Sequence, residues 1–205
     1  SSTSRGLGDV YKRQVIASRI GADILALGGN AVDAAVATGF ALAVTLPRAG
    51  NLAGGGFMLI HLTRESKTIA LDFREVAPAR ASRDMFLNLH GEVDNQLARS
   101  SIKSSGVPGT VAGLLHAHEK YGQLPLKQVI QPAIDLASKG IIVNVDLAHS
   151  IVSRAKRLTK NSATKKYYFK SSDEFYKPGD TLVQTDLADT IRRIAADGHL
   201  SLIHI

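Results

Sequence analysis

A run of three glycines followed by two strand-like segments limits the possible folds more than any other part of the sequence. Gly54–Gly56 precede an apolar segment, Phe57–Leu62, and a second segment, Thr68–Phe73, leads directly to Arg74. The polar residues 64–67 between the segments have the length of a tight turn, so the pattern predicts an antiparallel β-hairpin. Glycine lets the backbone approach another backbone or a ligand closely, and arginine offers a planar fork of donors for a carboxylate or a phosphate. The hairpin is therefore predicted to hold one anion-binding side chain beside a glycine-lined backbone.

The apolar side chains of the first strand form a nearly continuous run, which is typical of a strand that is covered on both faces. Helical spacing and capping residues indicate mostly helices elsewhere. We expect helices over residues 15–27, 31–45, 82–86, 110–120, 125–130, 132–139, 145–158 and 185–197, and surface loops over residues 90–105 and 159–180. A hairpin among helices predicts an α+β fold, with helices layered on a sheet.

The first two predicted helices have distinctive sequences. The apolar residues expected on one face of the first helix are Ile16, Ile20, Ile24 and Leu27. Gly28–Gly29 is a typical helix end, and Asn30 is a good N-cap for the second helix. The second helix is apolar almost all round and should be buried, while its many alanines and Gly39 favour close packing against a sheet. Its length and Asp33 argue against a membrane-spanning helix.

The two ends of the chain are related to each other as DNA. Residues 9–14 can be encoded by GAT GTG TAT AAG AGA CAG, and the reverse complement of this DNA encodes residues 200–205. The DNA resembles the mosaic-end adapter of transposon-based sequencing libraries. We therefore expect residues 1–14 and 200–205 to be adapter-derived or non-native, and residues 15–199 to be the natural segment, truncated at both ends.

Composition and motifs exclude some classes of site. The sequence has no cysteine, so disulfides and thiolate metal sites are excluded. The net charge of +7 is mostly scattered and lacks interleaved aromatic residues, so we predict no nucleic-acid partner. The histidines lack the spacing of metal ligands, and His116 and His118 are expected to be ordinary surface residues. No Gly-x-Ser-x-Gly motif indicates a serine nucleophile.

Two features of the hairpin region have alternative interpretations. Gly54–Gly56 match neither a P-loop nor a dinucleotide-binding loop, and composition favours a close approach of two backbone segments over a ligand site. Arg74 could form an internal ion pair with Asp72 or Glu75, or it could bind a substrate anion. Residue patterns alone leave both roles of Arg74 open.

Several separated blocks of the sequence resemble the γ-glutamyltranspeptidase (glutathione hydrolase) family. They are GGNAVDAAVATGFALAVTLP at 28–47, AGNLAGGGFMLI at 49–60, LDFREVAP at 71–78, SGVPGTVAGLLHAHEKYG at 105–122 and QPAIDLASKG at 131–140. The blocks occur in the family's order, and the resemblance covers residues 15–199 as a truncated N-terminal part of the large subunit. It implies part of an αββα N-terminal-nucleophile hydrolase sandwich, incomplete in this chain, with no cofactor and no metal.

The resemblance also implies a mechanism. The family's precursor cuts itself, and the new N-terminal threonine of the small subunit becomes the nucleophile. This threonine forms a γ-glutamyl ester, which is then transferred to water, an amino acid or a peptide. Arg74 matches the family arginine that binds the α-carboxylate of the γ-glutamyl group, and Glu75 matches a residue near the same pocket. The implied partners are the small subunit and glutathione or other γ-glutamyl compounds.

The chain departs from the family pattern because no stretch matches the small subunit, which supplies the threonine and the oxyanion-binding glycines. We therefore expect no catalytic residue in this chain and no activity from the chain alone. The alternatives are a cephalosporin acylase of the same family and a non-catalytic homologue that binds γ-glutamyl or amino-acid ligands. By resemblance, the protein is expected in the periplasm or outside the cell.

Overall fold

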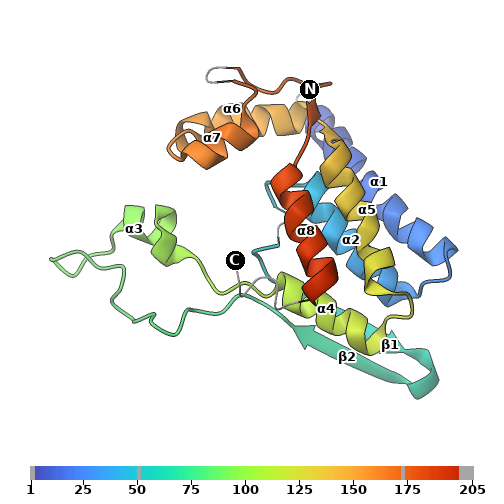
Figure 1. The fold of residues 1–205 in the computed structure, drawn as a ribbon. Coiled ribbons are helices and arrows are strands. Elements are labelled where there is room, and N and C mark those ends of the chain that lie inside the picture. Colours follow the sequence, from blue (N-terminus) through green and yellow to red (C-terminus); the bar gives the residue numbers. More distant parts are fainter. Residues whose placement is uncertain (1–2, 50–51, 172–173, 199–205) are drawn as a thin grey trace. The chain divides into compact units, whose positions relative to one another are not determined.

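The computed structural model describes residues 3–49, 52–171 and 174–198, with side chains described from residue 15 onward. The chain divides into a helical unit, residues 1–51 and 114–205, and a hairpin unit, residues 52–113. Helix α4 (Thr110–Tyr121) begins in the hairpin unit and ends in the helical unit. The combination of helices with small antiparallel sheets confirms the predicted α+β class (Figure 1).

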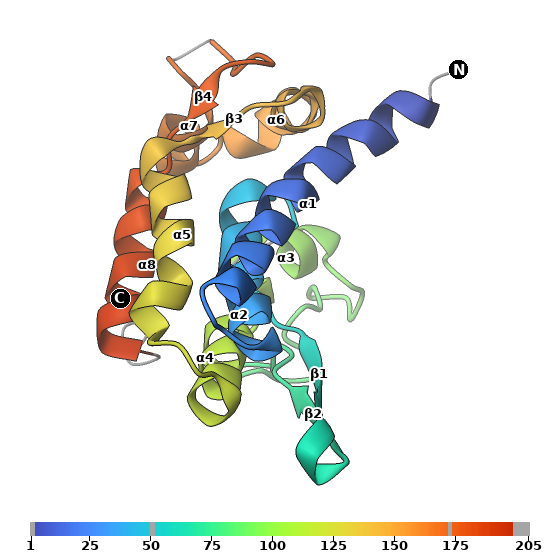
Figure 2. The ribbon, with the colours of Figure 1, turned by 90° about the vertical axis from the view of Figure 1, so that its right-hand side faces the viewer.

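Long helices form the centre of the helical unit. Their bounds are α1 Thr3–Ala26, α2 Ala31–Thr45, α5 Leu126–Lys139 and α8 Thr185–Asp197. Helix α2 contacts both α1 and α5, and α5 also contacts α8 (Figures 1 and 2). The remaining elements are α6 (Val145–Leu158), α7 (Ser162–Tyr168) and the antiparallel strands β3 (Ile141–Ile142) and β4 (Thr181–Leu182).

Helix α2 begins at a capping box and is buried along most of its length. The Asn30 side chain accepts hydrogen bonds from the backbone N–H groups of Val32 and Asp33, and the Asp33 carboxylate accepts one from the Asn30 N–H. This geometry confirms Asn30 as the predicted N-cap. None of the described helices, α2 included, is long and apolar enough to cross a membrane.

Within its unit, α2 packs on helices rather than on a sheet, which corrects the prediction from its alanines and Gly39. Gly39 lies so close to α4 that an added Cβ would be 3.0 Å from Cδ1 of Leu114. Small side chains admit a neighbouring helix as readily as a sheet, and composition cannot distinguish the two kinds of neighbour.

Helix α1 begins earlier than predicted, and only part of its predicted apolar face is buried. It starts at Thr3, because no proline interrupts the segment and extending an existing helix costs little. The side chains of Ala17, Ile20 and Ile24 are buried, whereas Ile16 and Leu27 are exposed. The buried stripe therefore runs through Ala17, Ile20 and Ile24, and Ile16 and Leu27 lie outside it.

Helix α5 is continuous, which corrects the prediction of separate helices over residues 125–130 and 132–139. Pro132 lies inside α5, where it removes a backbone hydrogen bond at a cost of about 3 kcal/mol. Packing on α2 and α8 offsets this cost, since Ile130 and Ala133 on either side of the proline are buried. The helix ends at Gly140, which has a φ of 88°, as the sequence predicted.

The predicted loops and the predicted short helix also need correction. Helix α3 (Asn95–Ser100) lies within residues 90–105, and α7 lies within residues 159–180. Asp94 and Asn161 cap these helices with their side chains, a signal that the sequence analysis missed. Residues 82–86 form turns and not a helix, with the Met85 N–H bonded to the Ser82 carbonyl three residues back.

The hairpin unit contains the predicted antiparallel pair. Strand β1 (Phe57–Leu62) pairs with β2 (Lys67–Asp72), with Phe57 opposite Asp72, and the short 3₁₀ turn η1 (Thr63–Glu65) connects them. The prediction that β1 is covered on both faces is wrong for the described residues, because Phe57 is 65% exposed and Leu59 is 76% exposed. A two-stranded sheet has no further layer to cover that face.

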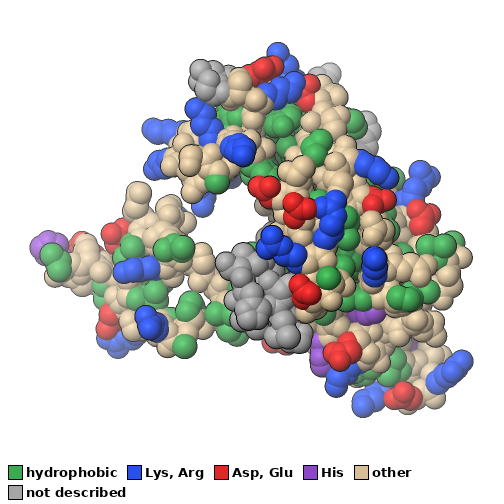
Figure 3. All heavy atoms as spheres, in the orientation of Figure 1, with side chains coloured by type: hydrophobic (Ala, Val, Ile, Leu, Met, Phe, Trp, Pro, Cys, Tyr) green, Lys and Arg blue, Asp and Glu red, His purple; other side chains and the backbone are tan. Residues whose placement is uncertain are grey.

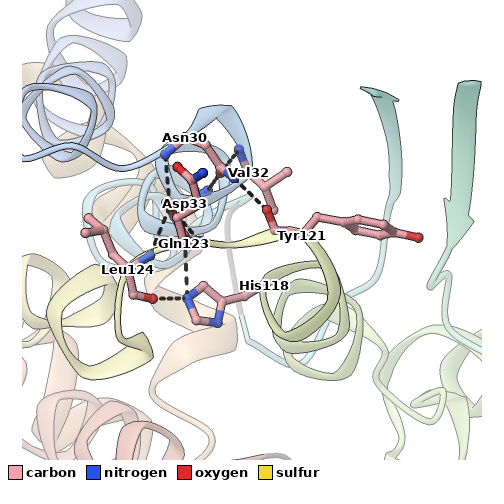
Figure 4. A network of polar contacts seen from close by, with 7 residues as sticks. All are labelled: Asn30, Val32, Asp33, His118, Tyr121, Gln123 and Leu124. Atoms are coloured by element: carbon pink, nitrogen blue, oxygen red, sulfur yellow. Dashed lines mark hydrogen bonds and ion pairs between the residues drawn. The ribbon is translucent and has the colours of Figure 1, made fainter. Parts of the chain in front are cut away.

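A fully buried carboxylate, that of Asp33, joins the start of α2 to the chain that follows α4 (Figure 4). Asp33 accepts hydrogen bonds from the backbone N–H groups of Gln123 at 3.1 Å and Leu124 at 3.3 Å, in addition to the Asn30 N–H at 2.9 Å. Nε2 of His118 lies 3.5 Å from Oδ1 of Asp33 and 2.9 Å from the Leu124 carbonyl oxygen. Because a carbonyl oxygen only accepts, Nε2 of His118 carries a proton and donates it.

This network corrects the prediction for His118. Its side chain is only 12% exposed and contacts a buried carboxylate, so it is not an ordinary surface residue. His116, two residues earlier, is exposed as predicted. Because consecutive helical positions are about 100° apart, His116 and His118 face different directions on α4.

We predict that His118→Ala lowers the free energy of unfolding by about 1–3 kcal/mol, because it removes a donor from a buried carboxylate and a carbonyl. The matched control His116→Ala changes an exposed position of the same helix and should cost less than about 0.5 kcal/mol. Urea denaturation of both variants measures the difference. Equal losses for the two histidines would show that the contact with Asp33 does not stabilise the protein.

Candidate functional site

The sequence-predicted site residues Arg74 and Glu75 lie directly beyond the end of β2. The Arg74 backbone N–H donates to Oδ1 of Asp72 at 3.0 Å, which fixes the chain as it leaves the strand. Phe73 continues the pairing past the strand end: its N–H donates to the Gly56 carbonyl at 3.0 Å, and the Gly56 N–H donates to the Phe73 carbonyl at 3.3 Å. The arginine thus follows immediately after the last hydrogen-bonded pair of the hairpin.

The glycine run lies against the backbone of Arg74. A Cβ added to Gly55 would be 2.8 Å from Cα of Arg74, 2.6 Å from the Glu75 nitrogen and 2.7 Å from the Phe73 carbonyl oxygen. No side chain fits at those distances, and the neighbouring atoms belong to backbone that cannot move aside. This is the close approach of two backbone segments that the glycine run predicted.

A second glycine-rich segment approaches the same backbone. The Gly54 carbonyl accepts hydrogen bonds from the N–H groups of Gly109 at 2.8 Å and Thr110 at 2.9 Å. A Cβ on Gly109 would overlap the Phe73 carbonyl oxygen, and one on Gly113 would overlap the Phe73 ring. The start of α4 is therefore held against Phe73, the residue that precedes Arg74.

The chain that follows Glu75 is also held to the second glycine-rich segment. Val76 and Val107 exchange backbone hydrogen bonds of 2.8 and 3.3 Å, which forms an isolated antiparallel bridge. We call the glycines that contact residues 73–75 the glycine clamp. They are Gly55, Gly56, Gly106, Gly109 and Gly113.

The side chain of Arg74 is exposed, in contrast to its fixed backbone. Within the part of the chain that the structure describes, its guanidinium makes no hydrogen bond or ion pair. The Asp72 carboxylate bonds to the Arg74 backbone and not to the guanidinium, so the internal ion pair considered from the sequence is not formed. Glu75 is also exposed, and its Cβ lies near Gly106. The geometry leaves the planar fork of Arg74 accessible to a carboxylate or a phosphate.

Other candidate chemistry is sparse. The described residues contain no group of three or more His, Asp and Glu side chains that could hold a metal ion. His61 pairs through Nδ1 with the Thr68 hydroxyl across the hairpin at 3.0 Å, which is a cross-strand contact. The contact of His61 has a structural role, and Arg74 remains the candidate for ligand binding.

The part that Gly109 and Gly113 play in this site was not predicted from the sequence. The block SGVPGTVAG at residues 105–113 contains both glycines, but it was used only to predict a helix from residue 110 and to support the family resemblance. Glycines spaced along the first turn of a helix indicate close packing on that face, but a single sequence does not reveal the neighbour.

We predict that Gly109→Ala destabilises the protein by about 1–3 kcal/mol or more, because the new Cβ overlaps the Phe73 carbonyl. Gly39→Ala is the matched control, since there the new Cβ would meet only the flexible end of Leu114. Alanine also favours the helix, so the control should stay within about 1 kcal/mol of the unchanged protein. Thermal and urea unfolding measure both variants, and a neutral Gly109→Ala would contradict the clamp.

Comparisons with known proteins identify the family of the chain. A family model described as gamma-glutamyltranspeptidase matches residues 17–202. The glutathione hydrolase proenzyme of Escherichia coli (strain K12) is 50% identical over 191 residues, which are 93% of this chain and 33% of that protein. The acylase ACY 1 proenzyme of Pseudomonas sp. (strain V22) is 36% identical over 201 residues, which are 95% of this chain and 35% of that protein.

A solved structure indicates the same family. The crystal structure of Helicobacter pylori gamma-glutamyltranspeptidase superposes with a TM-score of 0.88 and 46% identity, covering 91% of this chain and 53% of that one. The chain spans about a third of the length of the curated relatives described above. Since the family model matches nearly the whole chain, the resemblance found in its sequence blocks is confirmed, and the chain belongs to the gamma-glutamyltranspeptidase family.

Proposed function

We propose that this chain is part of a γ-glutamyltransferase/glutathione hydrolase. The parent enzyme would cleave γ-glutamyl amides such as glutathione and transfer the γ-glutamyl group to water, amino acids or peptides. The observation that carries this proposal is the accessible, unpaired guanidinium of Arg74 on a backbone held by the glycine clamp. A fixed cation of this kind can hold one end of a substrate while chemistry takes place at the other end.

In the proposed reaction, Arg74 binds the α-carboxylate of the γ-glutamyl group through a charge-assisted contact. That contact would set the position of the γ-carbonyl carbon relative to the nucleophile. Glu75, the next residue, is proposed to lie near the same substrate group. Its carboxylate would favour the α-ammonium group, which carries the opposite charge.

The nucleophile is proposed to be the N-terminal threonine of a small subunit cut from the same precursor. Its hydroxyl attacks the γ-carbonyl carbon and gives its proton to the threonine's own α-amine, which then passes this proton to the substrate's amide nitrogen as the C–N bond breaks and the amine leaves. The resulting γ-glutamyl ester is then cleaved by water or by the amine of an acceptor. The word proenzyme in the names of the two curated relatives supports such a precursor. This chain by itself is proposed to be inactive, and its parent to be periplasmic or secreted.

A second candidate function has specific support. The similarity to the ACY 1 acylase favours an acylase as the alternative within the family, and the cephalosporin acylase considered from the sequence is an enzyme of this kind. A non-catalytic homologue that binds γ-glutamyl or amino-acid ligands is the third possibility. The three differ in what they do with a γ-glutamyl anilide: a transferase releases the aniline rapidly, an acylase that acts on other acyl groups releases it slowly, and a binding protein releases none.

We predict that Arg74→Ala in the parent enzyme raises KM for a γ-glutamyl anilide by about 10- to 100-fold, which corresponds to the loss of a charge-assisted hydrogen bond. Arg64→Ala is the matched control, since Arg64 is an exposed arginine in the η1 turn at the other end of the hairpin. Steady-state kinetics of both variants test the role. Unchanged KM in Arg74→Ala would remove Arg74 from the substrate site.

A further inference from the structure

The helical unit contains a cavity of about 560 Å³ beside α6 and α7 that none of the foregoing functions uses. Its walls come from Pro47 and Arg48 after α2, from one face of α6 and from Tyr168 at the end of α7. A volume of this size is typical of pockets that hold small organic molecules. The cavity is therefore large enough for a ligand and not merely for water.

The face of α6 that lines the cavity combines hydroxyl groups with guanidinium groups. Ser150, Ser153, Arg154 and Arg157 all line it. Their spacing of three, four and seven residues from Ser150 places them on one face of the helix. Ile151 also lines the cavity but is itself buried, so the wall beneath the polar groups is apolar. An apolar wall lowers the local dielectric and strengthens the attraction of an arginine for an anion.

A third arginine completes the group. Nη1 of Arg48 contacts Oδ1 of Asp146 at 3.2 Å, which holds Arg48 at the start of α6. This contact uses one of the five N–H donors of the guanidinium. Within the described residues, Arg154 and Arg157 have no ion-pair partner, and no Asp or Glu lines the cavity. The cavity therefore gathers three guanidinium groups with one neighbouring carboxylate.

The surrounding segment concentrates the positive charge of the whole chain. Residues 145–170 contain seven Lys or Arg residues and one Asp, a net charge of +6, while the whole chain carries +7. Figure 3 shows Lys and Arg side chains gathered over α6 and α7. Such a field raises the local concentration of anions and speeds their approach.

Tyr168 adds a neutral donor to the wall. Burial raises the pKa of its phenol, so the hydroxyl stays protonated at neutral pH. A protonated phenol can donate a hydrogen bond to an anion without adding negative charge.

We propose that this cavity is a binding site for a small organic anion that bears carboxylate or phosphate groups. Arg154 and Arg157 bind the anionic groups through their N–H forks, and Arg48 completes the positive wall. The limited volume of the cavity and its buried apolar wall favour a small ligand over a nucleic acid, which needs an extended track of phosphate contacts. The proposal does not depend on the function proposed for Arg74.

The test is isothermal titration of the intact parent protein with inorganic phosphate and, separately, with citrate, at constant ionic strength. At least one of the two anions should bind saturably, and the anion that binds more tightly distinguishes a phosphate ligand from a carboxylate ligand. Arg157→Gln should weaken the preferred anion by at least about tenfold. Lys156→Gln is the matched control: it makes the same charge change one residue away, outside the cavity lining.

Two further variants make the result specific. Arg74→Ala should leave the binding unchanged, because Arg74 does not line this cavity. Arg154→Lys keeps the charge but loses the planar fork, so it should give a smaller loss than Arg154→Gln. The unfolding temperature of each variant without ligand should stay unchanged, since Arg154 and Arg157 are exposed.

Three outcomes would overturn the proposal. The first is the absence of saturable binding for both anions. The second is an equal loss in Lys156→Gln and Arg157→Gln, which would indicate a general surface field. The third is binding lost in Arg74→Ala, which would place the anion at the other site. Binding of duplex DNA without binding of phosphate or citrate falls under the first outcome.

Discussion

The structure of the helical unit depends on the hydrogen bonds that are donated to one buried carboxylate. A charge inside a protein is tolerated only when hydrogen bonds replace those it made with water. Asp33 obtains them from the start of its own helix and from a segment about 90 residues later in the chain, around Gln123. The other end of α2 is held in a similar way, because Nε2 of the buried Gln184 donates to the Val44 carbonyl at 3.0 Å. Polar contacts from distant segments thus define both ends of the most buried helix, and apolar packing fills the space between them.

The hairpin unit is held together by close backbone packing and not by a buried charge. Its glycine clamp has no charge and little apolar surface. Gly55 and Gly109 nevertheless lie so close to the backbone of Phe73 that no side chain fits at either position. The result is a fixed backbone that carries an exposed arginine. Holding the backbone lowers the ordering cost that a ligand would otherwise meet when it binds the guanidinium. The site therefore separates the group that binds from the groups that hold it in place.

Several features with a local signal were predicted correctly from the sequence. The N-cap at Asn30, the helix ends at Gly140 and Gly198 and the β-hairpin all depend on residues that are neighbours in the chain. The caps at Asp94 and Asn161 are equally local and were missed. Pro132 misled the prediction, because its cost is local while the packing that offsets it comes from α2 and α8.

In the candidate site, too, the residues with a local signal were the ones predicted from the sequence. Arg74 and the glycine run could be found from a single stretch of sequence, and the family resemblance supplied the expected ligand. The contribution of Gly109 could not be found in this way, since its partner Phe73 is distant in the sequence. The same holds for His118, whose burial depends on the position of Asp33.

The exposure of Phe57 and Leu59 has a practical consequence for handling the protein. These residues alternate along β1 and present a row of apolar side chains to water. An uncovered apolar strand face beside an unpaired strand edge is a common starting point for self-association. The exposed face of β1 is therefore a liability for the solubility of the hairpin, and it favours association between copies of the chain at high concentration.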